Sequence, residues 1–264
     1  MTAPNSLYIP GEGRLHRLHP LTKLTFTLAS AVVIFGAPGG WLPAAAPGLL
    51  ALCFLWRAGL AAAVLQKIFR LLAPLTVVLL LVHGFFSPLN RTVLFSLGPL
   101  SAGQEGAAYA ALILLRLAAV LAASLLTVVT THPARLVQAL FEAGLPYGLA
   151  YLLGSPLLLL PQIAGRVKAI QAAQQARGLE TEGGLLQRAR AFFPLAAPLI
   201  FSTLLDVEER ALALEVRGFS APTPKTSLYQ LVDTPRQRAA RWSMLLLAGL
   251  LLAAGFWWRV HAGA

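Results

Sequence analysis

The sequence predicts an all-α integral membrane protein with about five transmembrane helices and a separate group of cytoplasmic helices. Three observations lead to this fold class. Hydrophobic residues make up 57% of the 264 residues and charged residues only 12%, whereas soluble domains carry about 25% charged residues. The mean hydropathy is +0.71. The apolar residues gather in runs, and most of the positive charge lies between those runs.

Five apolar runs are the predicted spans. They occupy residues 24–35, 41–56, 71–87, 107–130 and 244–258. Only the fourth exceeds the roughly 20 residues that a spanning helix needs. The turn Gly36-Ala37-Pro38-Gly39-Gly40 separates the first two, which form either two short tilted helices or one re-entrant hairpin. Both alternatives return the chain to the side of the membrane that it left.

The distribution of Lys and Arg predicts the orientation. With a cytoplasmic N-terminus, 18 of the 21 Lys and Arg residues fall in cytoplasmic segments. Only Arg91 and Arg259 fall outside, and Arg116 lies within the fourth span. Cytoplasmic loops are enriched in Lys and Arg, so we expect the N-terminus to be cytoplasmic. The tryptophans at the ends of the second and last spans are typical of interfacial anchors, although ordinary helix packing would also place them there.

Residues 132–242 form the predicted cytoplasmic region, between a membrane region at 1–131 and a last span at 243–264. Apolar residues recur in it at helical spacing, which predicts packed helices and not a polar tail. One helix is expected from about Leu185 to Arg217, with a kink or a new start near Ala197 because Pro194 and Pro198 each remove a backbone donor. Within it, Asp206 and Arg210 have the i,i+4 spacing of a surface ion pair.

Two short segments of this region are nearly the same. Gln175-Ala176-Arg177-Gly178-Leu179 and Glu215-Val216-Arg217-Gly218-Phe219 each place an arginine at the end of a helical run, followed by a glycine. Such a pair can be only a favourable C-terminal cation with a glycine cap. Its occurrence twice, each time closing a long helix, favours a shared function. A guanidinium offers planar bidentate donors, which can fix the orientation of a bound partner.

These paired segments resemble the signature of the T component (the transmembrane coupling subunit, of the EcfT/CbiQ type) of energy-coupling factor (ECF) transporters. The segment from Tyr8 to Leu24, with Pro20-Leu21-Thr22-Lys23, resembles the opening pattern of the same family. The residues alone predict a turn at Pro20 and a positively charged anchor at Lys23. The second motif departs from the family in having Val216 where alanine is commoner.

The resemblance implies a non-catalytic subunit of an ABC-type importer in the prokaryotic cytoplasmic (inner) membrane. Its implied partners are two ABC-type ATPase subunits, which hydrolyse ATP, and one small membrane substrate-binding (S) subunit for a vitamin or a transition-metal ion such as cobalt or nickel. The implied ATPase-docking residues close the two helices. They are Ala176, Arg177, Gly178, Val216, Arg217 and Gly218.

The sequence predicts no catalytic, cofactor or metal site in this chain. The best candidate for a phosphate-binding loop, residues 218–226, has Pro224 where such a loop needs glycine before the lysine. His16 and His19 are i,i+3 neighbours without an acidic or cysteine partner nearby, and Glu180 and Glu182 lie in a predicted turn outside the spans. Cys53 has no partner for an internal disulfide, since it is the only cysteine.

Two other functional classes stay open as alternatives, a stand-alone membrane enzyme and a scaffold that binds anionic lipid. The cations of residues 132–242 would attract membrane lipids, but no motif for nucleic acid accompanies them, so no nucleic-acid partner is expected. Arg116 is the one charge deep in a span, where a cation is costly and indicates a function or a buried pair. A membrane partner and a phospholipid headgroup are equal candidates for its contact.

Overall fold

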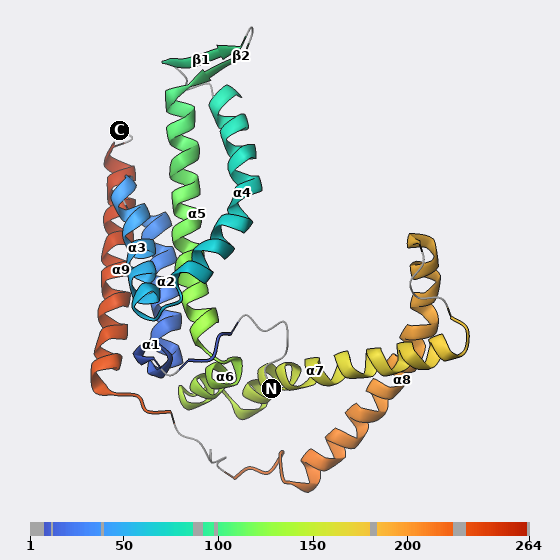
Figure 1. Ribbon diagram of the computed structural model, residues 1–264. Coiled ribbons are helices and arrows are strands. Elements are labelled where there is room, and N and C mark those ends of the chain that lie inside the picture. Colours follow the sequence, from blue (N-terminus) through green and yellow to red (C-terminus); the bar gives the residue numbers. More distant parts are fainter. Residues whose placement is uncertain are drawn as a thin grey trace. The chain divides into compact units, whose positions relative to one another are not determined.

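The computed structural model describes residues 8–11, 13–37, 40–86, 92–97, 100–179, 184–223 and 231–262, and these residues are mostly helical (Figure 1). The elements, in chain order, are α1 (Arg14–Arg17), α2 (Pro20–Gly36), α3 (Trp41–Arg57), α4 (Ala61–Phe86), β1 (Val93–Leu97), β2 (Leu100–Gly103), α5 (Gln104–Thr130), α6 (Pro133–Glu142), α7 (Tyr147–Ala176), α8 (Leu185–Val216) and α9 (Pro235–Ala262). The chain divides into two compact units. One contains residues 141–230, and the other contains residues 2–140 and 231–264. The predicted all-α class is confirmed.

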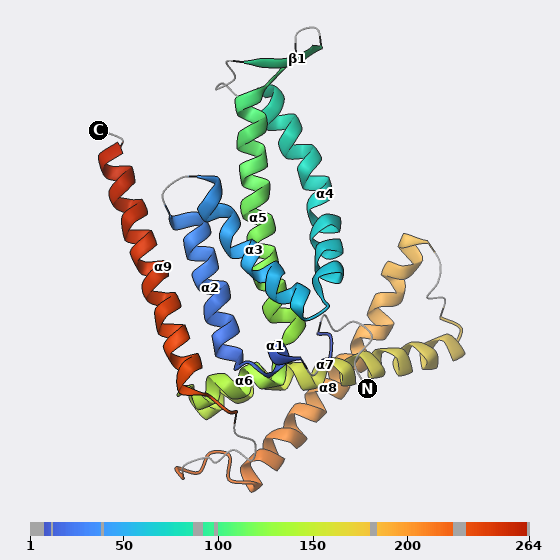
Figure 2. The same ribbon diagram turned by 60° about the vertical axis from the view of Figure 1, so that its left-hand side comes forward.

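Helix α5 is the centre of the unit formed by residues 2–140 and 231–264. It packs against α2, α3 and α4, while α9 packs along α2 on the far side (Figures 1 and 2). A helix near the start of the chain and the last helix, α9, are therefore neighbours. The unit is closed by segments that are more than 200 residues apart in sequence.

Small residues allow the helices of this unit to approach closely. A Cβ added at Gly48 of α3 would lie 2.7 Å from the backbone of Ala119 on α5. At Gly255 of α9, an added Cβ would collide with the carbonyl group of Gly36 on α2. Contacts of this kind between small residues are common where apolar helices associate within a membrane. The buried core of this unit is made of Leu15, Ala51, Leu55, Val64, Ile68, Ala122, Ala123, Leu126 and Val129.

A polar seam joins α2 to the end of α5. Lys23 is 3% exposed, and its Nζ donates a hydrogen bond to the Thr130 carbonyl oxygen over 2.9 Å. One turn further along, the hydroxyls of Thr27 and Thr127 lie 2.8 Å apart, and Thr127 donates to the Lys23 carbonyl oxygen. The prediction of a charged anchor at Lys23 is therefore wrong. The cation is buried, and a backbone carbonyl from another helix satisfies it.

The N-terminal segment lies against this seam. The Ile9 amide donates to the Val129 carbonyl oxygen, and His16 Nε2 donates to the Ile9 carbonyl oxygen, each over 3.0 Å. Pro20 occupies the first position of α2, where its missing N–H costs nothing. The predicted turn at Pro20 is thus the start of a helix, which the Nδ1 of His19 caps by accepting from the Leu21 amide over 3.3 Å.

The helices differ in length from the predicted apolar runs. The first two predicted spans are two separate helices, α2 and α3, of 17 residues each. By length and composition, five helices among the described residues could cross a membrane: α4, α5, α7, the 191–216 part of α8, and α9. The expectation that only the fourth span exceeds 20 residues is wrong, because α4 and α9 continue into flanking polar residues. Helices α7 and α8, predicted to be cytoplasmic, also qualify by length and composition.

A β-hairpin that the sequence analysis did not predict connects α4 to α5. Strands β1 and β2 are antiparallel, with Phe95 opposite Ala102 and Leu97 opposite Leu100, and a bulge lies between Val93 and Phe95. The backbone amide and hydroxyl of Thr92, just before β1, both donate to the Glu105 carboxylate in the first turn of α5. The hairpin is thus tied to the start of the helix that follows it.

Candidate docking site at two helix ends

Polar cross-links hold α7 and α8 together in an antiparallel pair. Arg166 of α7 forms an ion pair with Asp206 of α8 and donates to the Ser202 carbonyl oxygen over 3.4 Å. Arg210 of α8 donates to Gln162 of α7 over 3.3 Å. The predicted pair between Asp206 and Arg210 is therefore wrong. Both side chains reach across to α7 and do not bond to each other.

The two prolines of α8 do not interrupt it. The helix is continuous from Leu185 to Val216, so no new start occurs near Ala197. Pro198 cannot donate to the carbonyl oxygen of Pro194, which a helix would otherwise satisfy from position i+4. Gln174 of α7 supplies a donor instead, since its Nε2 lies 3.3 Å from that oxygen. Gln174 is three residues before Arg177, so this bond connects the proline segment of α8 to the end of α7.

Helix α7 ends in a glycine cap that fixes the backbone position of Arg177. Gly178 has φ +88°, a left-handed conformation that glycine adopts at little cost. The Gly178 amide donates to the Gln175 carbonyl oxygen over 2.9 Å, and the Leu179 amide to that of Gln174 over 3.0 Å. These two bonds define a Schellman motif, in which Arg177 is the C-cap residue.

Helix α8 ends with the same geometry. Gly218 has φ +71°, its amide donates to the Glu215 carbonyl oxygen, and the Phe219 amide donates to that of Leu214, each over 2.9 Å. Arg217 occupies the C-cap position that Arg177 has in α7. The two similar sequences therefore build two matching helix ends.

Both arginines are available to a partner. Arg177, Gly178 and Arg217 are exposed. Neither guanidinium forms a hydrogen bond or ion pair within the part of the chain that the structure describes. The preceding residue of the second motif, Val216, is 88% exposed, so its larger side chain crowds no helix in that same part of the chain. Each helix end thus presents a permanently charged group that has no partner among the described residues.

An aromatic cluster anchors the second helix end, and sequence reasoning missed it. The ring of Phe219 lies 5.1 Å from that of Tyr147 and 5.2 Å from that of Tyr151, measured between centroids. Tyr147 also contacts Phe141 of α6, with centroids 5.7 Å apart. Because Phe219 directly follows Gly218, the end of α8 is fixed to the start of α7. The aromatic residue that follows Gly218 in the sequence is the signal from which this cluster could have been predicted.

The other residues singled out from the sequence do not assemble into a reaction centre. No group of three possible metal ligands occurs among the described residues. His16 is buried against Tyr8, and His19 caps α2. The Nε of Arg116 is buried and has no hydrogen-bond partner in the described ranges. Pro224, Lys225 and Thr226 of the loop candidate, and the predicted turn with Glu180 and Glu182, lie outside the described residues.

Comparison with known proteins gives consistent matches along the chain. The family model described as cobalt transport protein (CbiQ) matches residues 11–228. A Brevibacillus brevis protein named energy-coupling factor transporter transmembrane protein EcfT is 31% identical over 263 residues, which cover 96% of each chain. Proteins of the same name from Listeria innocua and Bacillus subtilis are 30% and 28% identical, covering 96% and 92% of this chain and 96% and 95% of the relatives.

Proposed function

Because this chain belongs to the cobalt transport protein (CbiQ) family, we propose that it is the coupling subunit of an energy-coupling factor importer. It is a multi-pass membrane protein and a transmembrane component of that class of transporter. The finer proposal concerns its mechanism. Arg177 and Arg217 each dock onto one of two ATPase subunits, and α7 and α8 carry the motion of those subunits toward the membrane.

The observation that carries this proposal is the equivalence of the two helix ends. Two partners of the same kind need two similar docking points. The chain presents two arginines on matching Schellman caps, and neither has a partner among the described residues. A bidentate guanidinium held at a helix end can bond a carboxylate or a carbonyl-lined groove in one orientation. The caps keep each arginine in a fixed position relative to its helix axis.

Force transmission requires that a displacement at one helix end is not absorbed locally. The cross-links from Arg166 to Asp206 and from Gln174 to the Pro194 carbonyl oxygen join the two helices along their length. The contact of Phe219 with Tyr147 joins the end of α8 to the beginning of α7. A push on one arginine is thus shared by both helices.

The surface of α8 supports the presence of membrane or protein partners. Ten of its large apolar side chains among the described residues are each more than half exposed, and these are Leu186, Phe192, Phe193, Ile200, Phe201, Leu204, Leu205, Val207, Leu212 and Val216. Soluble monomers rarely expose so many large apolar side chains on one helix. We assign this surface to contact with lipid or with a small substrate-binding membrane subunit, which would capture a vitamin or a transition-metal ion. ATP hydrolysis would take place in the partner ATPases, with the N-terminus of this chain in the cytoplasm.

Co-purification tests the proposal. The tagged chain is extracted from its native membrane in mild detergent, and the accompanying polypeptides are identified for wild type, Arg177→Ala/Arg217→Ala and Lys168→Ala. Lys168 is exposed on α7 away from both caps, so the last variant removes a charge without touching a docking point. We expect two nucleotide-binding subunits with wild type and Lys168→Ala, and their loss from the double variant, since truncating one partner of a buried charge pair costs about 2–5 kcal/mol.

Each other outcome has a definite meaning. If the double variant retains its nucleotide-binding subunits in full, the docking role of the arginines is wrong. If wild type brings down no such subunit in any detergent, the transporter proposal loses its main support. A membrane enzyme or a lipid-binding scaffold would then account better for the chain.

A further inference from the structure

A cavity of about 500 Å³ opens at the end of α3. It falls within the range of about 300–1,000 Å³ that is usual for ligand sites. Its lining comes from α1, the following turn and the end of α3, and consists of Gly13, Leu15, Leu18, Phe54, Arg57 and Ala58. All of these residues belong to the unit built around α5.

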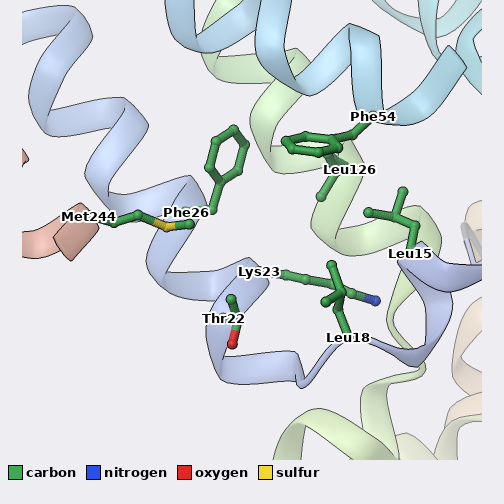
Figure 3. A pocket seen from close by; sticks show the side chains of 8 residues that line it. All are labelled: Leu15, Leu18, Thr22, Lys23, Phe26, Phe54, Leu126 and Met244. Atoms are coloured by element: carbon green, nitrogen blue, oxygen red, sulfur yellow. The ribbon is translucent and has the colours of Figure 1, made fainter. Parts of the chain in front are cut away.

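A smaller apolar hollow of about 80 Å³ adjoins this cavity and shares Leu15, Leu18 and Phe54 with it (Figure 3). There the rings of Phe26 and Phe54 meet edge to face, with centroids 6.4 Å apart. Met244 reaches in from α9 toward Phe26 (Figure 3). Lys23 contributes only its aliphatic chain, because its Nζ is bonded to the Thr130 carbonyl oxygen. The inner end of the site is therefore apolar.

The mouth of the cavity carries a positive charge that has no partner among the described residues. Arg57 is exposed in the last turn of α3 and has no hydrogen bond or ion pair with the described residues. Trp56 beside it is 76% exposed, as a tryptophan at a membrane interface would be. The helix dipole accounts for an arginine at a C-terminus, but it does not explain the cavity beneath that arginine.

The length of α3 places this mouth near the level of lipid headgroups. Its 17 residues span about 25 Å at 1.5 Å per residue, which is less than the roughly 30 Å of hydrocarbon in a bilayer. A short helix draws its flanking cations toward the interface by snorkelling and thins the bilayer around it. Arg57, the last residue of α3, is thus within reach of lipid phosphates, while Phe54 lies about one turn further into the helix.

We propose that this cavity binds one anionic phospholipid. Arg57 bonds the phosphate, and an acyl chain enters past Phe54 and Leu18 toward Phe26. The combination of a cation at the rim and an apolar interior favours this occupant over a small anion, which would leave the apolar lining uncovered. Phe54 is 46% exposed, so the acyl chain has a route into the cavity from the lipid side.

Native mass spectrometry of the full chain in detergent tests the proposal. Phosphatidylglycerol and phosphatidylcholine of identical acyl chains are titrated onto wild type, Arg57→Gln, Leu18→Trp and Arg70→Gln. Arg70 is exposed on α4 and does not line the cavity, so it controls for general charge attraction. We expect Arg57→Gln to lower the affinity for phosphatidylglycerol about fivefold, which corresponds to the roughly 1 kcal/mol contributed by one cation beside an anionic surface. Arg70→Gln should bind as wild type does.

Leu18→Trp tests whether the acyl chain occupies the cavity. A larger side chain fills the space, so tight phosphatidylglycerol binding should fall although Arg57 is unchanged. Wild type incubated with an excess of inorganic phosphate gives the same information without a variant, since phosphate should not displace the lipid if the acyl chain contributes. Equal losses for Arg57→Gln and Arg70→Gln, displacement by inorganic phosphate alone, or unchanged binding by folded Leu18→Trp would each overturn the proposal.

Discussion

The glycine cap of α7 gives a prediction whose size follows from the structure. A Cβ added at Gly178 would meet nothing within 4 Å, so Gly178→Ala introduces no steric clash. The whole penalty comes from φ +88°, which costs a residue with a side chain about 1–2 kcal/mol. Asparagine tolerates this conformation better, so Gly178→Asn should recover most of the loss. Gly165, in the interior of α7 with equally open surroundings, is the matched control, and Gly165→Ala should stabilise the helix by up to about 1 kcal/mol.

Amide hydrogen exchange measures this effect where it arises. The amides of Gly178 and Leu179 close the cap by bonding to Gln175 and Gln174, so their exchange reports its opening. A loss of 1–2 kcal/mol corresponds to exchange about 5 to 30 times faster, and we expect that increase for Gly178→Ala but not for Gly178→Asn or Gly165→Ala. If Gly178→Ala exchanges as slowly as wild type, the cap does not hold the position of Arg177, and the structural argument for a fixed docking point fails.

The packing of α9 and its entry loop gives two further predictions. Gly255→Ala should destabilise the α5-centred unit by about 1–3 kcal/mol in detergent thermal unfolding, because its Cβ would collide with Gly36, whereas Gly249→Ala on the same helix meets nothing and should be neutral or stabilising. Equal melting temperatures for Gly255→Ala and Gly249→Ala would contradict the close approach of Gly255 to Gly36. Asp233 receives hydrogen bonds of 3.0 and 2.7 Å from Arg241, which hold the pKa of that carboxyl below its usual range. The resulting stability is present above the usual aspartate pKa and is lost as the pH falls through the lowered value, so wild type should lose more stability than Asp233→Asn between pH 5 and pH 3. If the stability of wild type and of Asp233→Asn falls equally over this pH range, the pair of Asp233 and Arg241 contributes nothing to stability.

The sequence predicted features that depend on neighbouring residues along the chain. Arg177-Gly178 and Arg217-Gly218 close helices because a C-cap forms within one turn, and its glycine can be recognised locally. The prediction of an all-α membrane protein succeeded for a similar reason, since composition alone separates such chains from soluble domains. The hairpin before α5 was missed although Gly98-Pro99 between two apolar segments is a turn signal.

The failures arose where a residue from another helix decides the outcome. Lys23 was predicted to be a positively charged anchor, but it is buried and its acceptor is the Thr130 carbonyl oxygen on α5. Asp206 was paired with Arg210 on its own helix, but Arg166 of α7 is its partner. Sequence spacing identifies which side chains can meet within one helix. It does not indicate which face of that helix packs against a second one.

Photo-crosslinking tests the central proposal most directly, namely that the two arginine caps contact ATPase subunits. A photoreactive amino acid is placed at Val216, which is 88% exposed beside Arg217, and in a control at Trp258 near the end of α9, which is 56% exposed. Irradiation of native membranes should crosslink a nucleotide-binding subunit to the Val216 variant and none to the Trp258 variant. Crosslinks of the Val216 variant only to lipid or to other membrane proteins, in cells that take up the solute, would contradict the docking of this helix end on an ATPase.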